Sequence, residues 1–403
     1  MMNSTYVIDG IRTPVGKHTG SLSSIRTDDM AAIVIKELMR RNPGVNPSEI
    51  NHVVLGCANQ AGEDNRDVAR MALLLAGLPT NVSGETVNIL CASGMASVIN
   101  ASGAISLGNG DLMIAGGVES MTRAPFVLSK SSQAFGRNVE IFDSSIGWRF
   151  VNPKMKKMYG TDSMGETAEN VAELYKINRE DQDLFAFNSQ MKATVANNKG
   201  RFKREIVAVE IIQGKKAPVV FEHDEFIKPD TTLETLSKLK PAFRENGSVT
   251  AGNSSGINDG SAALLLASEN GIKKNNLKPL ARIVSSAVVG VEPRIMGIGP
   301  VGASNLALKR AGLTFKDMNV IELNEAFAAQ GLACIREWGL DDNDPRINPN
   351  GGAIAIGHPL GMSGSRLILT AALELQERNE KFALCTMCVG VGQGYAVIIE
   401  NVN

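Results

Sequence analysis

The segment Thr86-Val87-Asn88-Ile89-Leu90-Cys91-Ala92-Ser93-Gly94-Met95 joins a short apolar stretch to small residues that open a helix-like pattern. We expect a strand over Thr86–Leu90, a helix over Ser93–Leu107 and a further strand over Asp111–Gly116. Cys91 then stands at a helix N-terminus, where unpaired N–H groups and roughly half a positive charge favour thiolate over thiol. The sequence therefore predicts a lowered pKa and a reactive thiol at Cys91.

The same alternation of strand and helix patterns extends on both sides of this segment. Before it, strands are expected at Tyr6–Asp9 and His52–Gly56 and helices at Asp28–Arg41 and Asp64–Ala76. The last part of the chain repeats the rhythm, with elements expected at Ala281–Val289, Ser304–Ala311, Val320–Leu323, Ser363–Arg378, Phe382–Cys385 and Tyr395–Glu400. This pattern is typical of an α/β fold with a largely buried sheet, and it suggests two duplicated halves.

Between the halves, residues 121–250 carry more charge and fewer strand patterns. Two amphipathic helices are expected near Thr167–Tyr175 and Arg179–Asn198. The chain then passes through the small, polar stretch Thr250–Gly260, which allows close approach of a backbone to a ligand, and enters a strand at Ala262–Ala267. We expect the middle segment to be an insertion that covers the core.

Composition limits the classes of partner and compartment. The 403 residues exceed one ordinary core, and a net charge of -1 provides no overall field for nucleic acid or an anionic membrane. Five scattered cysteines do not form a disulfide framework, and neither a signal peptide nor an apolar run of roughly 20 residues is evident. We therefore expect a soluble cytoplasmic protein.

His358, one of four histidines, follows the glycine-rich run that begins at Gly351 and precedes Pro359 and Gly361. Such a loop suits a ligand-facing side chain, although a core histidine bonded to a backbone group is the ordinary alternative. A neutral imidazole here could take the proton of Cys91.

Cys385 and Cys388 form a C-x-x-C pair, which invites a redox or zinc interpretation. Both interpretations are weak, because a thioredoxin-type pair should open a helix and zinc needs two more ligands at suitable spacing. Cys388 alone, two residues before Gly390, fits an active site better.

Asn324, in the run Glu322-Leu323-Asn324-Glu325-Ala326-Phe327-Ala328, follows a buried strand pattern. It could simply cap the next helix, a role that asparagine performs well. Its functional alternative is to hold a water or donate to a developing oxyanion.

Four motifs in this order resemble the thiolase family. They are Cys91-Ala92-Ser93-Gly94, Asn324-Glu325-Ala326-Phe327, Gly357-His358-Pro359 and Cys388-x-Gly390, and the resemblance spans nearly the whole chain. It implies an α/β fold of two similar βαβαβαββ halves in a layered α/β/α/β/α arrangement with an inserted loop domain. The expected domains are residues 1–122 with 251–278, the insertion 123–250, and residues 279–403. The resemblance also implies a homodimer or homotetramer.

The resemblance further implies roles for these residues. Cys91 would be the nucleophile that carries the acyl group, His358 would activate it, and Cys388 would exchange a proton with the α-carbon or the leaving thiol. Asn324, through a water, and His358 would form one oxyanion hole, and the backbone N–H groups of Cys91 and Gly390 the other. Two thiols are needed because one cysteine cannot hold the acyl chain and move the α-proton at once.

The resemblance also implies binding positions, which are carried over where this sequence matches the family. Coenzyme A, which is a substrate, would contact Ser255, Lys228, Thr235, Ala251 and Phe243, and Met164 and Phe327 are further substrate-binding or coenzyme A-binding positions. No cofactor and no metal is expected.

A finer resemblance concerns the acyl chain. The segments Gly56–Arg66, Ile146–Pro153, Asp162–Met164 and Glu292–Pro300 look like the 3-oxoadipyl-CoA thiolase branch, which releases succinyl-CoA and acetyl-CoA. The distal carboxylate of that substrate must not be buried unpaired. Arg149, or a lysine of Lys154-Met155-Lys156-Lys157, is expected to meet it.

Three alternatives stay open. The first is an acetyl-CoA acetyltransferase or general 3-ketoacyl-CoA thiolase acting on acetoacetyl-CoA or fatty acyl chains. The second is a noncatalytic acyl-CoA-binding relative, against which the pair of Cys91 and Cys388 speaks. The third is a cysteine hydrolase, which would release a free acid instead of transferring the acyl group.

Overall fold

The first half of the fold is built on buried strands that alternate with helices. In the computed structural model, which describes residues 3–402, the order is β1 (Thr5–Arg12), α1 (Thr27–Arg41), β3 (His52–Gly56), α2 (Val68–Leu75), β4 (Ser83–Val87), α3 (Ser93–Ser106), β5 (Leu112–Ser120) and, after the insertion, β10 (Asn258–Ser268). Every residue of β5 and β10 is buried. Strands covered on both faces are expected to be apolar throughout, as the run Ala262–Ala267 is.

The second half follows the same plan. Its elements are β11 (Ala281–Gly290), α9 (Gly299–Ala311), β12 (Val320–Leu323), α10 (Ala328–Glu337), the short α11 (Ala353–Ile356), α12 (Leu360–Arg378), β13 (Phe382–Val389) and β14 (Gln393–Asn401). In place of a counterpart to β4, Ile347 makes a single parallel bridge with Ile321 of β12. The expected repeat of the first half is therefore visible in the order of the elements.

One mixed sheet joins the two halves. Its strand order is β12-β13-β14-β11-β1-β10-β5-β3-β4, with β2 (Gly16–Lys17) paired to β10. The halves meet where β1 pairs antiparallel with β11 through Tyr6–Arg282 and Val7–Ala281. In each half, parallel strands lie at the outside, and the antiparallel β10 or β14 lies next to the junction.

Helices α3 and α12 lie between the two halves of the sheet. Residues 361–375 of α12 are all buried, as expected of a helix that is surrounded by protein on every side. One core cluster combines these two helices with side chains from both halves of the sheet. Two outer clusters pack α1 and α2 on the first half and α9 and α10 on the second. The layered arrangement predicted from the sequence is confirmed.

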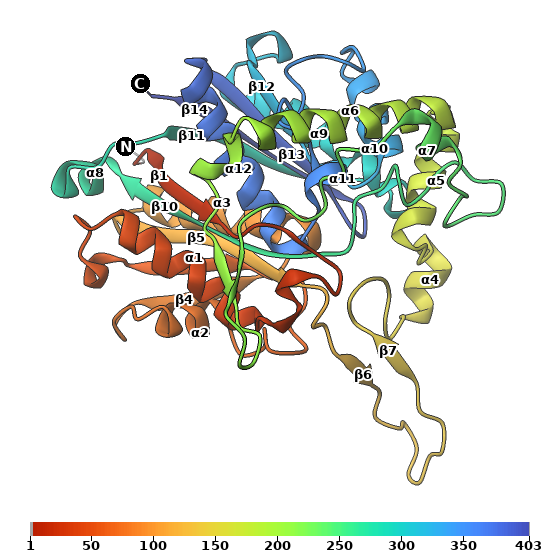
Figure 1. Cartoon of the computed structure of the whole chain (residues 1–403), viewed down its shortest axis with the longest axis horizontal. Helices are drawn as coiled ribbons and strands as arrows, with labels where there is room; N and C mark the ends of the chain where they lie inside the picture. The colour runs from red at the N-terminus through yellow and green to blue at the C-terminus, as the bar shows by residue number, and fades with distance from the viewer. Residues whose placement is uncertain (1–2, 403) are drawn as a thin grey trace.

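The insertion contributes most of the irregular structure. It contains β6 (Phe126–Leu128), β7 (Ile141–Asp143), α4 (Pro153–Tyr159), α5 (Met164–Leu174), α6 (Arg179–Asn198), β8 (Val209–Ile211), β9 (Val219–Phe221) and α7 (Leu233–Ser237), and α8 (Glu269–Asn275) follows β10. The hairpin of β6 and β7 projects from the body of the molecule, as Figure 1 shows. Side-chain caps at Asn152, Ser163, Asn178 and Thr232 fix where these helices begin. The domain boundaries given above stay a prediction.

Several expected elements differ in extent; for example, α9 begins at Gly299 and not at Ser304, and β13 ends at Val389 and not at Cys385. The strand expected over Thr86–Leu90 ends at Val87, because Leu90 has a φ of 51° and donates its N–H to the Asn88 side chain, which turns the chain out of the sheet. The helix expected from Asp64 begins at Val68, because Arg66 and Asp67 also have positive φ. Across residues 3–402, no helix is both long and apolar enough to span a membrane.

Candidate active site

Cys91 lies in a tight turn between β4 and α3. It is 8% exposed, and hydrogen bonds from the backbone N–H groups of Gly390 and of Cys91 itself favour its thiolate. Burial nevertheless dominates and raises the pKa of Cys91 to about 11. The sequence prediction of a lowered pKa is therefore wrong in this structure. Burial destabilises the thiolate more than the two N–H hydrogen bonds stabilise it.

His358 lies just before α12, at the position in the second half that Cys91 occupies in the first. Its Nδ1 is 2.6 Å from the Ser363 hydroxyl, which lies 2.8 Å from the Pro359 carbonyl. Because the hydroxyl donates to that carbonyl, its oxygen accepts from Nδ1–H, which leaves Nε2 without a proton. Burial, with a smaller effect of Arg366, lowers the pKa of His358 to about 3. His358 is therefore a neutral base with a free Nε2.

Asn324 lies beside that nitrogen. Its Nδ2 is 3.4 Å from His358 Nε2, and within residues 3–402 its buried Oδ1 has no hydrogen-bond partner. The capping alternative is wrong, because α10 begins at Ala328 and Phe327 occupies the cap position. The amide of Asn324 is instead aimed at the imidazole.

The two cysteines of the C-x-x-C pair occupy different environments. Cys385 lies in the central core cluster near α12, whereas Cys388 packs in a separate cluster with Met164 and Phe327. Residues three apart on a strand point to opposite faces, which explains the separation. Burial raises the pKa of Cys388 well above its usual range, and the nearby Cys91 raises it further. Among the candidates, Cys388 is thus the cysteine whose titration is linked to that of Cys91.

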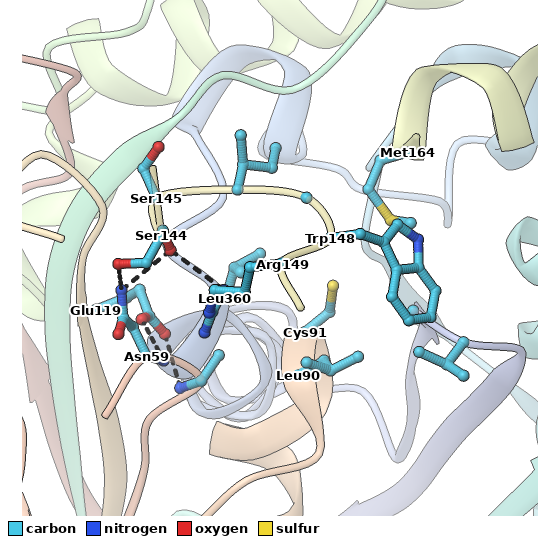
Figure 2. Close-up of a pocket in the computed structure, with 15 residues that line it drawn as sticks. Asn59, Leu90, Cys91, Glu119, Ser144, Ser145, Trp148, Arg149, Met164 and Leu360 are labelled. Carbon is cyan, nitrogen blue, oxygen red and sulfur yellow. Dashed lines mark hydrogen bonds between the residues drawn. The ribbon is translucent and has the colours of Figure 1, made fainter. Parts of the chain in front are cut away.

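A cavity of about 300 Å³ opens over the Cys91 thiol. Its walls come from the β3–α2 loop, segment 144–149 of the insertion, the starts of α5 and α12, and the turn at Gly390. In Figure 2, Trp148 and Met164 lie on one side of Cys91, and Arg149, Ser144 and Asn59 lie on the other. The cavity therefore has an apolar end and a polar end.

Among residues 3–402, Arg149 is the only lysine or arginine that lines this cavity. Its guanidinium lies 3.5 Å from the Ser144 carbonyl, and no ion pair joins it to a carboxylate in the described part of the chain. Lys154, Lys156 and Lys157 are exposed on α4 and do not line the cavity. Of the basic residues considered from the sequence, only Arg149 borders the space above Cys91.

The predicted coenzyme A contacts form two groups. Lys228, Thr235 and Ala251 line a second cavity of about 230 Å³. Phe243 makes an edge contact with Phe327 at a ring-centroid distance of 6.1 Å, and the Ser255 N–H donates to the carbonyl of Ala326. Gly165 leaves room for the ring of Phe243, since a side chain there would collide with it.

Sequence reasoning missed three residues around His358 and the cavity. Ser363 and Asn258 hold the imidazole and the backbone N–H of His358, and Glu119 lines the cavity. Glu119 offered a signal, because it is an acidic residue at the end of the otherwise apolar pattern Leu112–Val118. Neither Ser363 nor Asn258 offered such a signal. Asn258 is 100 residues from His358 in the sequence, and serine is a common residue type.

Comparisons with known proteins identify the family of the chain. Residues 5–270 match the model of the thiolase N-terminal domain, and residues 277–401 match that of the thiolase C-terminal domain. The chain belongs to the thiolase family.

Sequence identities to individual relatives show which members of that family the chain resembles. The chain is 60% identical, over the full length of both chains, to the 3-oxoadipyl-CoA/3-oxo-5,6-dehydrosuberyl-CoA thiolase of Escherichia coli. It is 44% identical to an acetyl-CoA acetyltransferase of Chromobacterium violaceum, with 98% of this chain and 99% of the relative covered.

Solved structures share the fold. The acetyl-CoA acetyltransferase of Bacillus anthracis superposes with a TM-score of 0.93 at 39% identity, covering 100% of this chain and 99% of the other. Human mitochondrial 3-ketoacyl-CoA thiolase in complex with CoA gives a TM-score of 0.91 at 39% identity, covering 100% and 98%.

Proposed function

We propose that this chain cleaves 3-oxoadipyl-CoA with coenzyme A to give succinyl-CoA and acetyl-CoA. The observation that carries the substrate is Arg149, a cation without an ion-pair partner at the polar end of the cavity over Cys91. A chain that ends in a carboxylate can pair with this guanidinium, whereas a fatty acyl chain would leave it unpaired. The name of the Escherichia coli relative supports the same substrate.

The proposed reaction begins with acyl transfer to Cys91. The Cys91 proton passes to Nε2 of His358, and the sulfur attacks the C3 carbonyl of the substrate. The bond between C2 and C3 breaks, the succinyl group stays on Cys91, and the acetyl-CoA carbanion takes the proton of Cys388. N–H groups of Gly390 and Cys91 on one side, and Asn324 with His358 on the other, are the donors proposed for the developing oxyanions.

The second half of the reaction restores both thiols. The Cys388 thiolate takes the proton of coenzyme A, whose sulfur attacks the thioester on Cys91. Succinyl-CoA leaves, and His358 returns its proton to Cys91. Lys228, Thr235, Ala251, Ser255 and Phe243 are proposed to hold coenzyme A, with Met164 and Phe327 beside the thioester. A homodimer or homotetramer and a cytoplasmic location stay predictions.

A matched pair of substrates tests the role of Arg149. 3-Oxohexanoyl-CoA has the chain length of 3-oxoadipyl-CoA but lacks its distal carboxylate. We expect kcat/KM for thiolysis to favour 3-oxoadipyl-CoA, and Arg149→Ala to lower that preference by about 10- to 100-fold through loss of a charge-assisted pair.

Lys154→Ala serves as the control, because that lysine is exposed and borders no part of the cavity. It should keep the preference of the wild type. Higher kcat/KM for acetoacetyl-CoA or 3-oxohexanoyl-CoA in the wild type would instead favour an acetyl-CoA acetyltransferase or a general 3-ketoacyl-CoA thiolase.

A further inference from the structure

Glu119, at the end of β5, is a buried carboxylate that belongs to no ion pair within residues 3–402. Its side chain is held instead by three backbone N–H groups. Oε2 accepts from Ala58 at 3.0 Å and from Gly361 at 2.8 Å, and Oε1 accepts from Asn59 at 3.0 Å. These donors favour the charged form, but burial outweighs them and raises the pKa of Glu119 to about 7.

These donors belong to two segments that meet at the cavity over Cys91. Ala58 and Asn59 lie in the β3–α2 loop, whereas Gly361 is the second residue of α12. His358 precedes that helix by two residues, and Leu360 lines the cavity. Glu119 therefore connects the start of the helix that follows His358 to the wall of the acyl cavity.

Helix α12 has no cap from its own sequence. Pro359 occupies the cap position and makes no side-chain hydrogen bond there. The first N–H groups of a helix need acceptors, and the carboxylate of Glu119 supplies one from a different element. The start of α12 also packs closely on β3 and β5, because a side chain at Gly361 would collide with the carbonyl oxygens of Gly56 and Val118.

The connection continues into the insertion. Asn59 donates from Nδ2 to the carbonyl and the hydroxyl of Ser144, each at 3.1 Å. Ser144 begins the segment that carries Arg149 into the cavity. The loop that Glu119 fixes is thus the same loop that anchors the covering segment.

We propose that Glu119 is a positioning residue, whose carboxylate holds the start of α12, and with it His358, against the loop that walls the acyl cavity. The inference rests on the proposed function, since it assumes that His358 takes the proton of Cys91. An amide cannot replace the carboxylate, because its NH₂ group would face the N–H of Asn59 or those of Ala58 and Gly361. Glu119→Gln therefore leaves at least one buried donor unpaired.

The test measures alkylation of Cys91 by iodoacetamide in the full chain from pH 5 to 9, with the modified peptide identified by mass spectrometry. In the wild type His358 takes the Cys91 proton as the sulfur attacks, so the rate should rise less steeply with pH than it does without that base. In His358→Ala the thiolate must form by proton loss to solvent, so the rate should rise about tenfold per pH unit. A change in fold stability alone does not convert one profile into the other.

We expect Glu119→Gln to slow alkylation at pH 7 by about 10- to 100-fold, since small displacements of a reacting group have effects of this size. Its rate should also rise with pH, as in His358→Ala. Adding Glu119→Gln to His358→Ala should then change the rate less than about two-fold, because a residue that acts through His358 has nothing left to position.

Two further variants complete the test. Asp64→Asn changes a buried carboxyl beside Glu119 that accepts from Gly62 and does not touch α12, and it should keep the wild-type profile. Glu119→Asp keeps the charge but shortens the side chain, so it should fall between wild type and Glu119→Gln. If Glu119→Gln does not fold, the alkylation rate and pH profile of Glu119→Asp test the proposal instead.

The outcomes separate the two proposals. A wild-type profile in Glu119→Asp and Glu119→Gln, or an equal further loss when Glu119→Gln is added to His358→Ala, would overturn the role of Glu119. A wild-type profile in His358→Ala would instead overturn the proposed base and leave no basis for positioning.

Discussion

The starts of α3 and α12 occupy matching places in the two halves but are built differently. Cys91, before α3, borders the cavity and keeps its sulfur free of any side-chain partner that the structure describes. His358, before α12, is held by Ser363 and Asn258 and faces Asn324. The group proposed to carry the acyl chain is open, and the group proposed to take its proton is fixed. A duplicated scaffold can thus supply two unlike reactants at one junction.

Replacing either thiol should have the largest effect. The variant at Cys91 tests the role given to the start of α3, and the variant at Cys388 tests the second thiol. Cys91→Ser should lower formation of the acyl-enzyme by about 10⁴-fold or more, since it replaces the thiol with a much less reactive hydroxyl. Cys388→Ala should still become acylated from acetyl-CoA but should not complete thiolysis. The mass of the intact protein and steady-state turnover measure the two steps. Equal residual turnover in both variants would contradict the division of labour.

Removing the base should have the next largest effect. His358→Ala should reduce kcat/KM for thiolysis by about 10²- to 10⁴-fold at pH 7. With pKa values of about 11 for Cys91 and about 3 for His358, both groups are neutral at this pH in the wild type. Rising pH increases the thiolate fraction that the variant obtains without a base, so its deficit should shrink as the pH rises. A deficit that grows with pH would contradict this assignment.

The fixed state of His358 predicts a smaller effect at Ser363. Ser363→Ala removes the acceptor of Nδ1–H and lets the proton occupy Nε2, where it blocks the base. We expect a loss in kcat of about 10-fold, equivalent to one hydrogen bond, with little change in KM.

Ser365→Ala is the matched control for Ser363→Ala. This buried serine lies on the same helix, donates to the Met362 carbonyl and makes no hydrogen bond to His358. It should leave kcat within about two-fold of the wild type on the scale of typical mutational effects. An equal loss in both serine variants would indicate a general effect on α12.

The sequence predicts those helices and strands whose bounds depend on residues close together in the chain. Strands β3 and β12 and helix α6 have the predicted bounds, because alternation, apolar runs and the Asn178 cap are local signals. The pKa of Cys91 was predicted in the wrong direction, since helix position is visible in sequence but burial by other segments is not. The role of Glu119 depends on contacts across the fold, which no spacing encodes, whereas Ser363 lies only five residues from His358 but belongs to a residue type too common to stand out. Asn324 and His358 were expected to act together only through the family resemblance, and no local pattern places their side chains 3.4 Å apart.

Segment 144–149, which forms one wall of the cavity, belongs to a different part of the chain from the four candidate catalytic residues. Cys91, His358, Asn324 and Cys388 lie next to strands and helices of the two halves, whereas Arg149 and Trp148 belong to the insertion between β5 and β10. Asn59 joins this segment to the body through Ser144. In the proposed function, recognition of the chain end and bond-making chemistry thus belong to separable stretches of sequence. Exchanging the segment between related proteins, with its Asn59 anchor kept, offers a direct route to new acyl specificity on an unchanged reaction centre.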